Sequence, residues 1–210
     1  ALKQIVSTHS LSGFSIRCWP ELKGNTCQCH MTPCYGIAKL ADDGIVAACE
    51  SDISSTVTMF MLQRLTGKPA VSLDYNTFNT ERNSIALWHC GSNALSLAEE
   101  VEKVSLRKPS NGGLFEANSG MGVEFSLKEG VVTLAKLTRE YDKMLIAGGK
   151  VVAPSPGYRG GIAEVCLDSP VEDFLSTAME EGFEHHLCLA YGDVKEDLTR
   201  ICKRLAIQLF

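Results

Sequence analysis

The pattern of apolar residues changes once along this chain, near Ser84, and this change limits the folds that the chain can adopt. Before it, the short apolar run Ile45–Cys49 is followed by Ile53–Leu65, where apolar residues recur at helical spacing, and by the apolar run Val71–Leu73. A strand, a helix and a strand in this order predict a βαβ unit, whose two strands should lie parallel in one sheet. The preceding segment Cys29–Ala41 predicts another helix.

After Ser84 the apolar runs are short and Gly, Asn or Ser separates them, which predicts strands joined by turns. Six such runs follow one another: Ile85–His89, Lys103–Leu106, Gly122–Leu127, Val131–Leu137, Lys143–Ile146 and Gly161–Leu167. They predict a small antiparallel barrel or sandwich. Helix signals return at Val171–Glu181 and Lys195–Leu205, with the apolar run Leu187–Tyr191 between them.

The expected fold is therefore α/β plus β: a parallel α/β part, flavodoxin-like or Rossmann-like, that is interrupted by a small antiparallel β-barrel. Residues 1–83 are expected to form the first α/β segment, residues 84–168 the barrel and residues 169–210 the returning α/β segment. A chain of 210 residues with 45% apolar content is long enough to bury a core of this kind.

Charge and hydropathy exclude two classes of partner. The net charge is −5 and the isoelectric point is near 5.6, so the surface lacks the positive charge that would neutralise phosphates, and no nucleic-acid partner is expected. The longest apolar runs, such as Gly44–Cys49, are much shorter than the roughly 20 residues of a membrane-spanning helix. A soluble protein without a membrane partner is expected.

The cysteines indicate a reducing compartment. There are nine, an odd number, and some lie inside apolar runs, as Cys166 and Cys188 do. Secreted proteins with disulfide frameworks seldom show this pattern, so a cytoplasmic location with free thiols is expected. Cys27, Cys29 and Cys34 lie close together, but their spacing differs from the paired C-x-x-C pattern of structural zinc sites.

Two carboxylates, Glu50 and Asp52, stand between the predicted strand Ile45–Cys49 and the predicted helix Ile53–Leu65. Open α/β sheets usually hold their ligands at such positions. Acidic residues at a helix start also have a structural explanation, because they cap the helix and interact well with its positive end. The local pattern leaves both interpretations open.

Other candidate residues stand apart from this pair. Glu21 follows Trp19 closely, and its local pattern alone is better explained by a surface acid in a turn. His89 is equally well explained as a hydrogen-bonded core histidine. His185 and His186 precede a predicted strand, so their side chains should point in opposite directions and at most one of them should face a given site.

Taken together, four segments resemble the L-fucose and L-arabinose isomerase-like family, in its metal-binding C-terminal portion. They are Trp19-Pro20-Glu21-Leu22, Ala48-Cys49-Glu50-Ser51-Asp52, Leu87-Trp88-His89-Cys90-Gly91, and His186 followed by Tyr191-Gly192-Asp193. Their order and approximate spacing match across nearly the whole chain. Members of this family are typically much longer, so the resemblance implies that the chain is either a C-terminal fragment of a longer enzyme, which is the expectation, or a reduced member of the family.

The resemblance also implies a set of site residues. A divalent metal, manganese first and magnesium or cobalt as alternatives, would be bound by Glu21, Asp52 and His186. Glu21 and Asp52 would in addition move protons. Residues implied in substrate binding or in support of the ligands are Glu50, Asp74, His89 and Trp19.

The implied activity is aldose–ketose isomerisation of a monosaccharide, a pentose, hexose or deoxyhexose, by a homo-oligomeric intramolecular oxidoreductase. The reaction moves a proton between neighbouring carbons through an enediol, which explains the need for two carboxylates beside a metal. The alternative is a non-catalytic carbohydrate-binding or assembly module that keeps the fold. The presence of Glu21, Asp52 and His186 together favours the enzyme.

Overall fold

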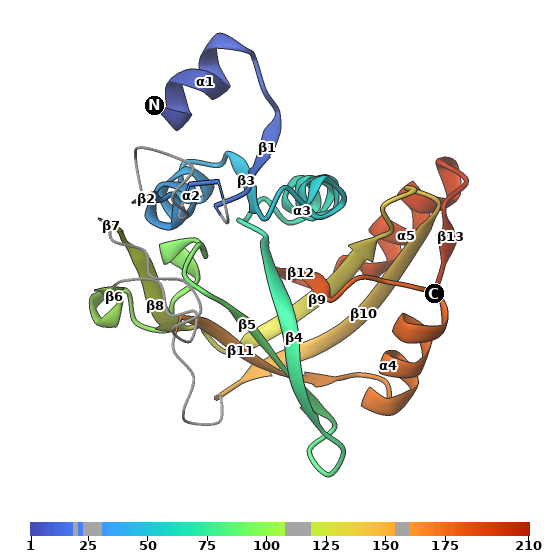
Figure 1. Ribbon diagram of the computed structural model, residues 1–210. Helices are drawn as coiled ribbons and strands as arrows, with labels where there is room; N and C mark the ends of the chain where they lie inside the picture. Colours follow the sequence, from blue (N-terminus) through green and yellow to red (C-terminus); the bar gives the residue numbers. More distant parts are fainter. Residues whose placement is uncertain (19–20, 23–30, 108–118, 154–159) are drawn as a thin grey trace.

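A closed barrel of six antiparallel strands forms the centre of the computed structural model, which describes residues 1–18, 21–22, 31–107, 119–153 and 160–210 (Figure 1). Around the barrel, each strand pairs with the next and the last pairs with the first. In this order the strands are β4 (Val71–Asn79), β5 (Ser84–His89), β11 (Gly161–Leu167), β10 (Lys143–Val152), β9 (Gly130–Leu137) and β12 (His186–Tyr191).

A small parallel sheet of β1 (Gly13–Ile16) and β3 (Val46–Cys49) lies above the barrel in Figure 1, together with α2 (Cys34–Asp42) and α3 (Ile53–Thr66). The remaining helices are α1 (Leu2–Thr8), α4 (Val171–Glu180), α5 (Lys195–Arg204), η1 (Leu95–Leu97) and η2 (Val101–Lys103). The remaining strands are β2 (Met31–Thr32), β6 (Ser105–Arg107), β7 (Ser119–Gly120), β8 (Gly122–Ser126) and β13 (Gln208–Leu209).

Helix α3 joins the small sheet to the barrel. It begins at Asp52, whose side chain accepts a hydrogen bond from the Ser55 backbone N–H, and it ends at Gly67, which adopts a left-handed φ of 66°. Between these caps, Met59 and Leu62 are buried in one cluster with residues of β3, β9 and β12. The helix start is thereby fixed against the end of the barrel where β12 begins.

The barrel interior is filled by large apolar side chains. Leu73, Leu87, Leu134 and Leu187 each have no exposed surface and belong to one continuous cluster. Burying a leucine completely stabilises a fold by about 1.5–3 kcal/mol. The interior is therefore a packed core.

The prediction of a βαβ unit is wrong for its second strand, which belongs to the barrel. Strand β3 pairs with β1, whereas β4 pairs antiparallel with β5 and β12. The reason is the length of β4, which continues past Leu73 to Asn79 and returns directly into β5 as a hairpin. Strand β12 is likewise a barrel strand, so the expected boundaries at residues 84 and 169 cut through the barrel. In the described residues, the parallel α/β part consists of β1 and β3 with α2 and α3.

Most of the predicted elements are confirmed. Helix α3, strand β11 and helices α4 and α5 lie within one residue of their predicted bounds. Helix α2 begins only at Cys34, after Pro33, and residues 29–30 of its predicted span lie outside the described residues. Lys103–Leu106 is wrong as a single strand, because it is divided between η2 and β6.

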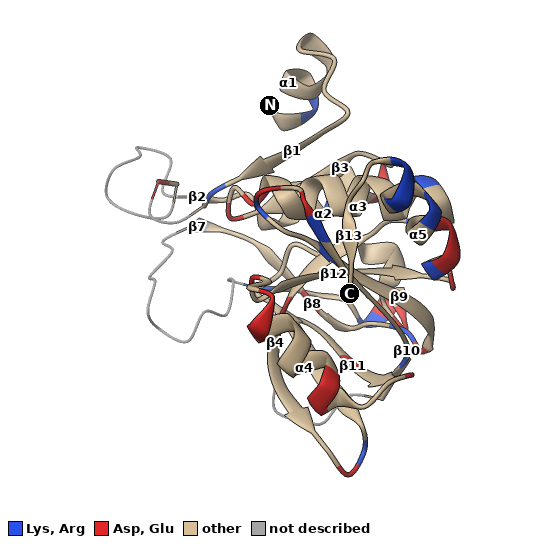
Figure 2. Ribbon diagram, turned by 90° about the vertical axis from the view of Figure 1, so that its right-hand side faces the viewer, with Lys and Arg blue, Asp and Glu red and all other residues tan. Residues whose placement is uncertain are grey.

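Helix α5 carries charged residues of both signs, as Figure 2 shows. Arg200 lies 3.2 Å from the carboxylate of Glu196 and 3.1 Å from that of Asp197.

Among the described residues, no helix is both long and apolar enough to cross a membrane.

The described cysteines are all free thiols: Cys18, Cys34, Cys49, Cys90, Cys166, Cys188 and Cys202. Burial raises the pKa of Cys188 to about 11, so its thiol is un-ionised at neutral pH. Cys27 and Cys29 lie outside the described residues.

We expect thiol titration of the denatured, unreduced protein to give nine thiols for the nine cysteines of the chain. A result of seven or fewer would show that a disulfide forms.

Candidate functional site

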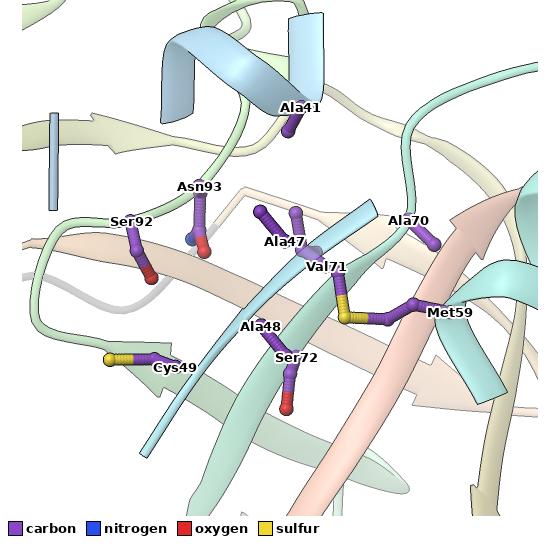
Figure 3. Close-up of a pocket in the computed structure, with 10 residues that line it drawn as sticks. All are labelled: Ala41, Ala47, Ala48, Cys49, Met59, Ala70, Val71, Ser72, Ser92 and Asn93. Carbon is purple, nitrogen blue, oxygen red and sulfur yellow. The ribbon is translucent and has the colours of Figure 1, made fainter. Parts of the chain in front are cut away.

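A small cavity lies beside β3, α3 and the start of β4 (Figure 3). Its wall is mostly apolar, with Ala48, Met59 and Val71 among the lining residues, and Ser92 and Asn93 lie at one side. The volume is about 10 Å³, which is at the lower limit for one water molecule. A substrate does not fit in this cavity.

A second pocket is open to solvent and has a volume of about 450 Å³, in the range of small-molecule sites. Its wall consists of residues 50–54, Arg139 and Tyr141 after β9, and residues 184–186 before and at the start of β12. The pocket therefore lies where the connection from β3 to α3 meets the end of the barrel. Polar and charged side chains predominate in this wall.

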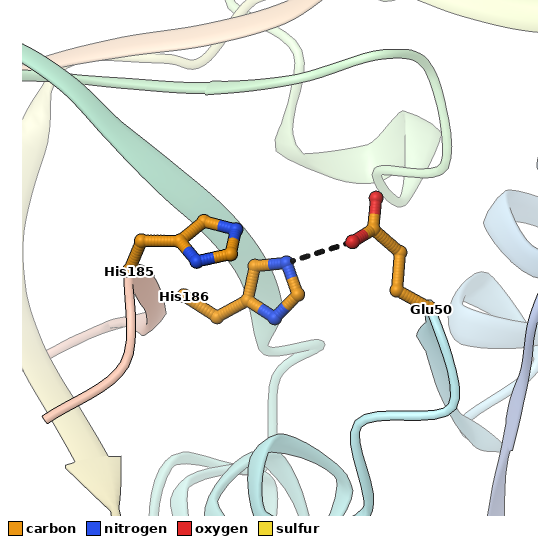
Figure 4. A group of neighbouring side chains, drawn as sticks. All are labelled: Glu50, His185 and His186. Carbon is orange, nitrogen blue, oxygen red and sulfur yellow. Dashed lines mark ion pairs between the residues drawn. The ribbon is translucent and has the colours of Figure 1, made fainter.

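The backbone between β3 and α3 brings Glu50 to the pocket. Glu50 and Ser51 both adopt left-handed φ angles, 60° and 59°, which cost a non-glycine residue about 1–2 kcal/mol each. Such strained positions often belong to functional sites. The side chain of Glu50 is half-exposed, and its Oε2 lies 3.4 Å from His186 Nε2 (Figure 4).

Asp52 is held by hydrogen bonds on both carboxylate oxygens. Its Oδ1 accepts from the Ser55 N–H (2.7 Å) and the Ser54 hydroxyl (2.8 Å). Its Oδ2 accepts from the Ser55 hydroxyl (2.6 Å), Lys136 Nζ (2.7 Å) and His186 Nδ1 (2.8 Å). Burial opposes ionisation of Asp52, but the hydrogen bonds from His186, Lys136 and Ser55 outweigh it and hold the pKa well below the usual range. Asp52 therefore caps helix α3 and also holds His186 through a charged hydrogen bond.

His186 lies at the centre of three carboxylates. Its Nδ1 contacts Asp52, while its Nε2 lies 3.2 Å from Asp74 Oδ1 and 3.4 Å from Glu50 Oε2. Burial lowers the pKa of His186, but the carboxylates of Asp52, Asp74 and Glu50 outweigh it and raise the pKa to about 11. This environment strongly favours a positive charge between the carboxylates.

His185 lies beside His186 in Figure 4, contrary to the expectation that their side chains point in opposite directions. The two ring centroids are 4.4 Å apart, and His185 Nε2 is 3.7 Å from Asp74 Oδ1. Side-chain alternation fails here because β12 begins at His186, so His185 is not part of the strand. The two side chains still differ in exposure: 64% of the His185 side chain is exposed, but only 8% of the His186 side chain.

The donor atoms of this group fit a divalent metal. Asp74 Oδ1 and His186 Nε2 are buried polar atoms that make no hydrogen bond, although they lie only 3.2 Å apart. Buried polar atoms are rarely left in this state, and two that face each other fit a common third partner. Ligand atoms of Glu50, His185 and His186 also lie within 4.8 Å of one another. Carboxylate oxygens and imidazole nitrogen together suit manganese-like ions.

The structure brings together two of the three metal ligands that the resemblance implied. Asp52 and His186 are in contact, whereas Glu21 forms an ion pair with Arg17, with Nε donating to Oε2 at 2.8 Å. Among the described residues, the group whose ligand atoms all lie within 4.8 Å of one another is Glu50, His185 and His186, so Glu21 lies outside it, as do Asp52 and Asp74. Asp52 contacts the Nδ1 side of the ring, opposite to the nitrogen that faces Glu50 and Asp74.

His89 is buried, and its Nδ1 lies 3.2 Å from the Ser92 hydroxyl, as in a hydrogen-bonded core histidine. Trp19 lies outside the described residues.

Sequence reasoning missed Lys136 and Glu184. Lys136 Nζ lies 2.7 Å from Asp52 Oδ2 and 3.0 Å from Glu184 Oε2, and Arg139 lies 2.8 Å from the other oxygen of Glu184. A signal for Lys136 was present in the sequence, since it is the one charged residue in the apolar run 131–137.

Comparison with known proteins identifies the family. Residues 87–210 match the family described as "L-fucose isomerase, C-terminal domain". A sulfoquinovose isomerase of Alkalicoccus urumqiensis is 33% identical over 204 residues, which are 96% of this chain and 44% of that protein. A sulfoquinovose isomerase of Priestia aryabhattai is 31% identical over 214 residues, 99% of this chain and 45% of that protein.

A third sulfoquinovose isomerase, from Clostridium sp. (strain MSTE9), is 27% identical over 213 residues, 99% of this chain and 46% of that protein. The chain thus spans less than half the length of these curated relatives. The family match covers more than half of the chain and includes most of the barrel. The chain belongs to the L-fucose isomerase C-terminal domain family.

Proposed function

We propose that this chain provides the metal-binding part of an aldose–ketose isomerase. The observation that carries the proposal is the convergence of Glu50 and Asp74 on Nε2 of His186, at 3.4 and 3.2 Å, while Asp52 holds Nδ1 of the same ring at 2.8 Å. A carboxylate behind a histidine is the usual arrangement around a metal-binding imidazole.

Glu50, Asp74 and His186 would bind the metal, and manganese is the ion that we expect. When bound, the metal supplies positive charge beside the sugar oxygens that become negative during isomerisation. This assignment replaces Glu21 and Asp52 in the implied ligand set by Glu50 and Asp74. Asp52 is more effective as an anchor than as a base, because five donors already occupy its two oxygens.

Glu50 and Asp74 also suit the transfer of a proton between neighbouring carbons of the sugar. Glu50 is half-exposed and faces the open pocket, so its Oε2 is accessible to a substrate. Its pKa lies below the usual value, chiefly because of its contact with His186, so the carboxylate is ionised and able to accept a proton at neutral pH. Asp74, whose Oδ1 lies 3.2 Å from Nε2 of His186, is our candidate for the second carboxylate that exchanges a proton with the substrate.

The relatives point to sulfoquinovose, a sulfonated hexose, as the substrate, and L-fucose and L-arabinose are the alternatives. Sugar selectivity depends on the part of the pocket that contacts the far end of the sugar. In this pocket Arg139 and Tyr141 are exposed beside Glu184 and can contact polar groups of a sugar.

The test is metal removal and reconstitution in the full-length protein. Chelation should abolish conversion of the aldose to the ketose, and Mn²⁺ should restore it, with carbon-13 NMR of labelled sulfoquinovose, L-fucose and L-arabinose as the measurement. We expect sulfoquinovose to be converted fastest. Failure to convert any of the three sugars with Mn²⁺, Mg²⁺ or Co²⁺ would overturn the proposal.

A further inference from the structure

Lys136 is a lysine with no exposed side-chain surface, in the barrel strand β9. A buried ammonium group is costly unless acceptors surround it. Here four oxygens lie within hydrogen-bond distance of Nζ: Asp52 Oδ2 at 2.7 Å, Ser55 Oγ at 2.9 Å, Ser54 Oγ at 3.0 Å and Glu184 Oε2 at 3.0 Å. The three N–H donors of Lys136 thus face two carboxylates and two hydroxyls, and these oxygens replace the water molecules that an exposed ammonium group would bind.

The same two serines connect Lys136 to Asp52 a second time. Their hydroxyls accept from Lys136 and donate to Asp52, Ser54 at 2.8 Å and Ser55 at 2.6 Å. The lysine, the serines and the aspartate therefore form a closed network at the start of α3. The side chain of Asp52 has little freedom to turn away from His186.

The orientation of His186 follows from this network. Asp52 Oδ2 already accepts from Lys136 Nζ and the Ser55 hydroxyl, and it is likewise the acceptor in the 2.8 Å contact to which Nδ1 of His186 donates. With Nδ1 engaged, Nε2 is directed at Asp74 and Glu50. The ring is thereby fixed in the orientation that a metal ligand requires.

We propose that Lys136 is a positioning residue of the isomerase site: its ammonium group holds Asp52, and Asp52 holds His186 with Nε2 directed at Glu50 and Asp74. The inference rests on the proposed function, because it assigns a role to the metal-binding arrangement. Without the lysine, Asp52 would lose the positive charge that lies between it and Glu184, and Glu184 would keep only Arg139 as its ion-pair partner. Repulsion between the two carboxylates would then favour movement of Asp52 away from the ring.

The test measures the affinity of the full-length protein for Mn²⁺ alone. Electron paramagnetic resonance detects the free ion, and the bound fraction is obtained from it. Lys136→Met should weaken Mn²⁺ binding about 10–100-fold, the effect typical of residues behind a metal ligand. Lys136→Arg keeps the charge and should recover part of the loss. The matched control is Lys143→Met on the neighbouring strand β10: Lys143 pairs with Glu181 at 3.0 Å and should not affect Mn²⁺ binding.

A double variant separates positioning from a general structural role. If Lys136 acts through Asp52, then Lys136→Met in an Asp52→Asn background should change Mn²⁺ affinity less than about threefold, because the residue through which it acts is already altered. The double variant also removes both buried charges, so it is informative even where Lys136→Met alone does not fold.

The outcomes distinguish this inference from the proposed function. If the wild-type protein does not bind Mn²⁺, then both the proposed metal site and the positioning role of Lys136 are contradicted. Wild-type affinity in a folded Lys136→Met protein, or a large further loss in the double variant, would overturn the positioning role and leave the proposed metal site intact.

Discussion

Asp74→Asn is expected to reduce kcat/KM for aldose–ketose conversion by about 10³-fold, while the protein stays folded. Asparagine has nearly the same shape as aspartate, but it carries no charge and cannot accept a proton as a base. Because Asp74 Oδ1 lies 3.2 Å from His186 Nε2, the substitution would remove a proposed metal ligand and a proposed proton carrier together. Losses of 10²–10⁴-fold are typical of a missing acid–base group alone.

The measurement is conversion of the aldose in the full-length protein at saturating Mn²⁺, with thermal unfolding recorded in parallel. Asp173→Asn is the matched control, since Asp173 is an exposed aspartate in the first turn of α4 and should leave activity within twofold of the wild type. Wild-type turnover in Asp74→Asn, with Mn²⁺ still bound, would exclude Asp74 from the chemistry.

The helices and most barrel strands could be predicted from local pattern, because a cap, a periodicity and a stop residue are all short-range features. Helix α3 shows this, with Asp52 before it, a buried face along it and Gly67 after it. Strand partners could not be predicted in the same way. The run at Val71–Leu73 identifies a strand, but only the full length of β4 and its hairpin with β5 decide that it joins the barrel.

The site was predictable only in part. His186 and the Glu50–Asp52 segment stand out in the sequence, and the structure places them together around one ring. Which carboxylate faces which nitrogen of the ring depends on left-handed backbone at Glu50 and Ser51 and on the burial of Lys136. These are tertiary features without a local signature, so the resemblance implied Asp52 as the ligand and Asp74 as a supporting residue, whereas our proposal exchanges these two roles.

The site also depends on the barrel core directly behind it, which leads to a stability prediction. Leu187 follows His186 on β12, has no exposed surface and lies opposite Leu73 of β4. Leu187→Ala should lower the free energy of unfolding by about 2–5 kcal/mol, because it removes buried apolar surface and leaves a cavity. For a chain of this size the midpoint of thermal unfolding should fall by about 4–20 °C.

Val131→Ala is the matched control in the same barrel. Val131 on β9 is 55% exposed, so its truncation should cost less than about 1 kcal/mol, mainly through β-propensity. Calorimetry of both variants is the measurement. If Leu187→Ala and Val131→Ala destabilise the protein equally, then the closed barrel does not pack as a core behind β12. If Leu187→Ala is much less stable than Val131→Ala but binds Mn²⁺ at low temperature like the wild type, then the core sets the stability of the site without setting its geometry.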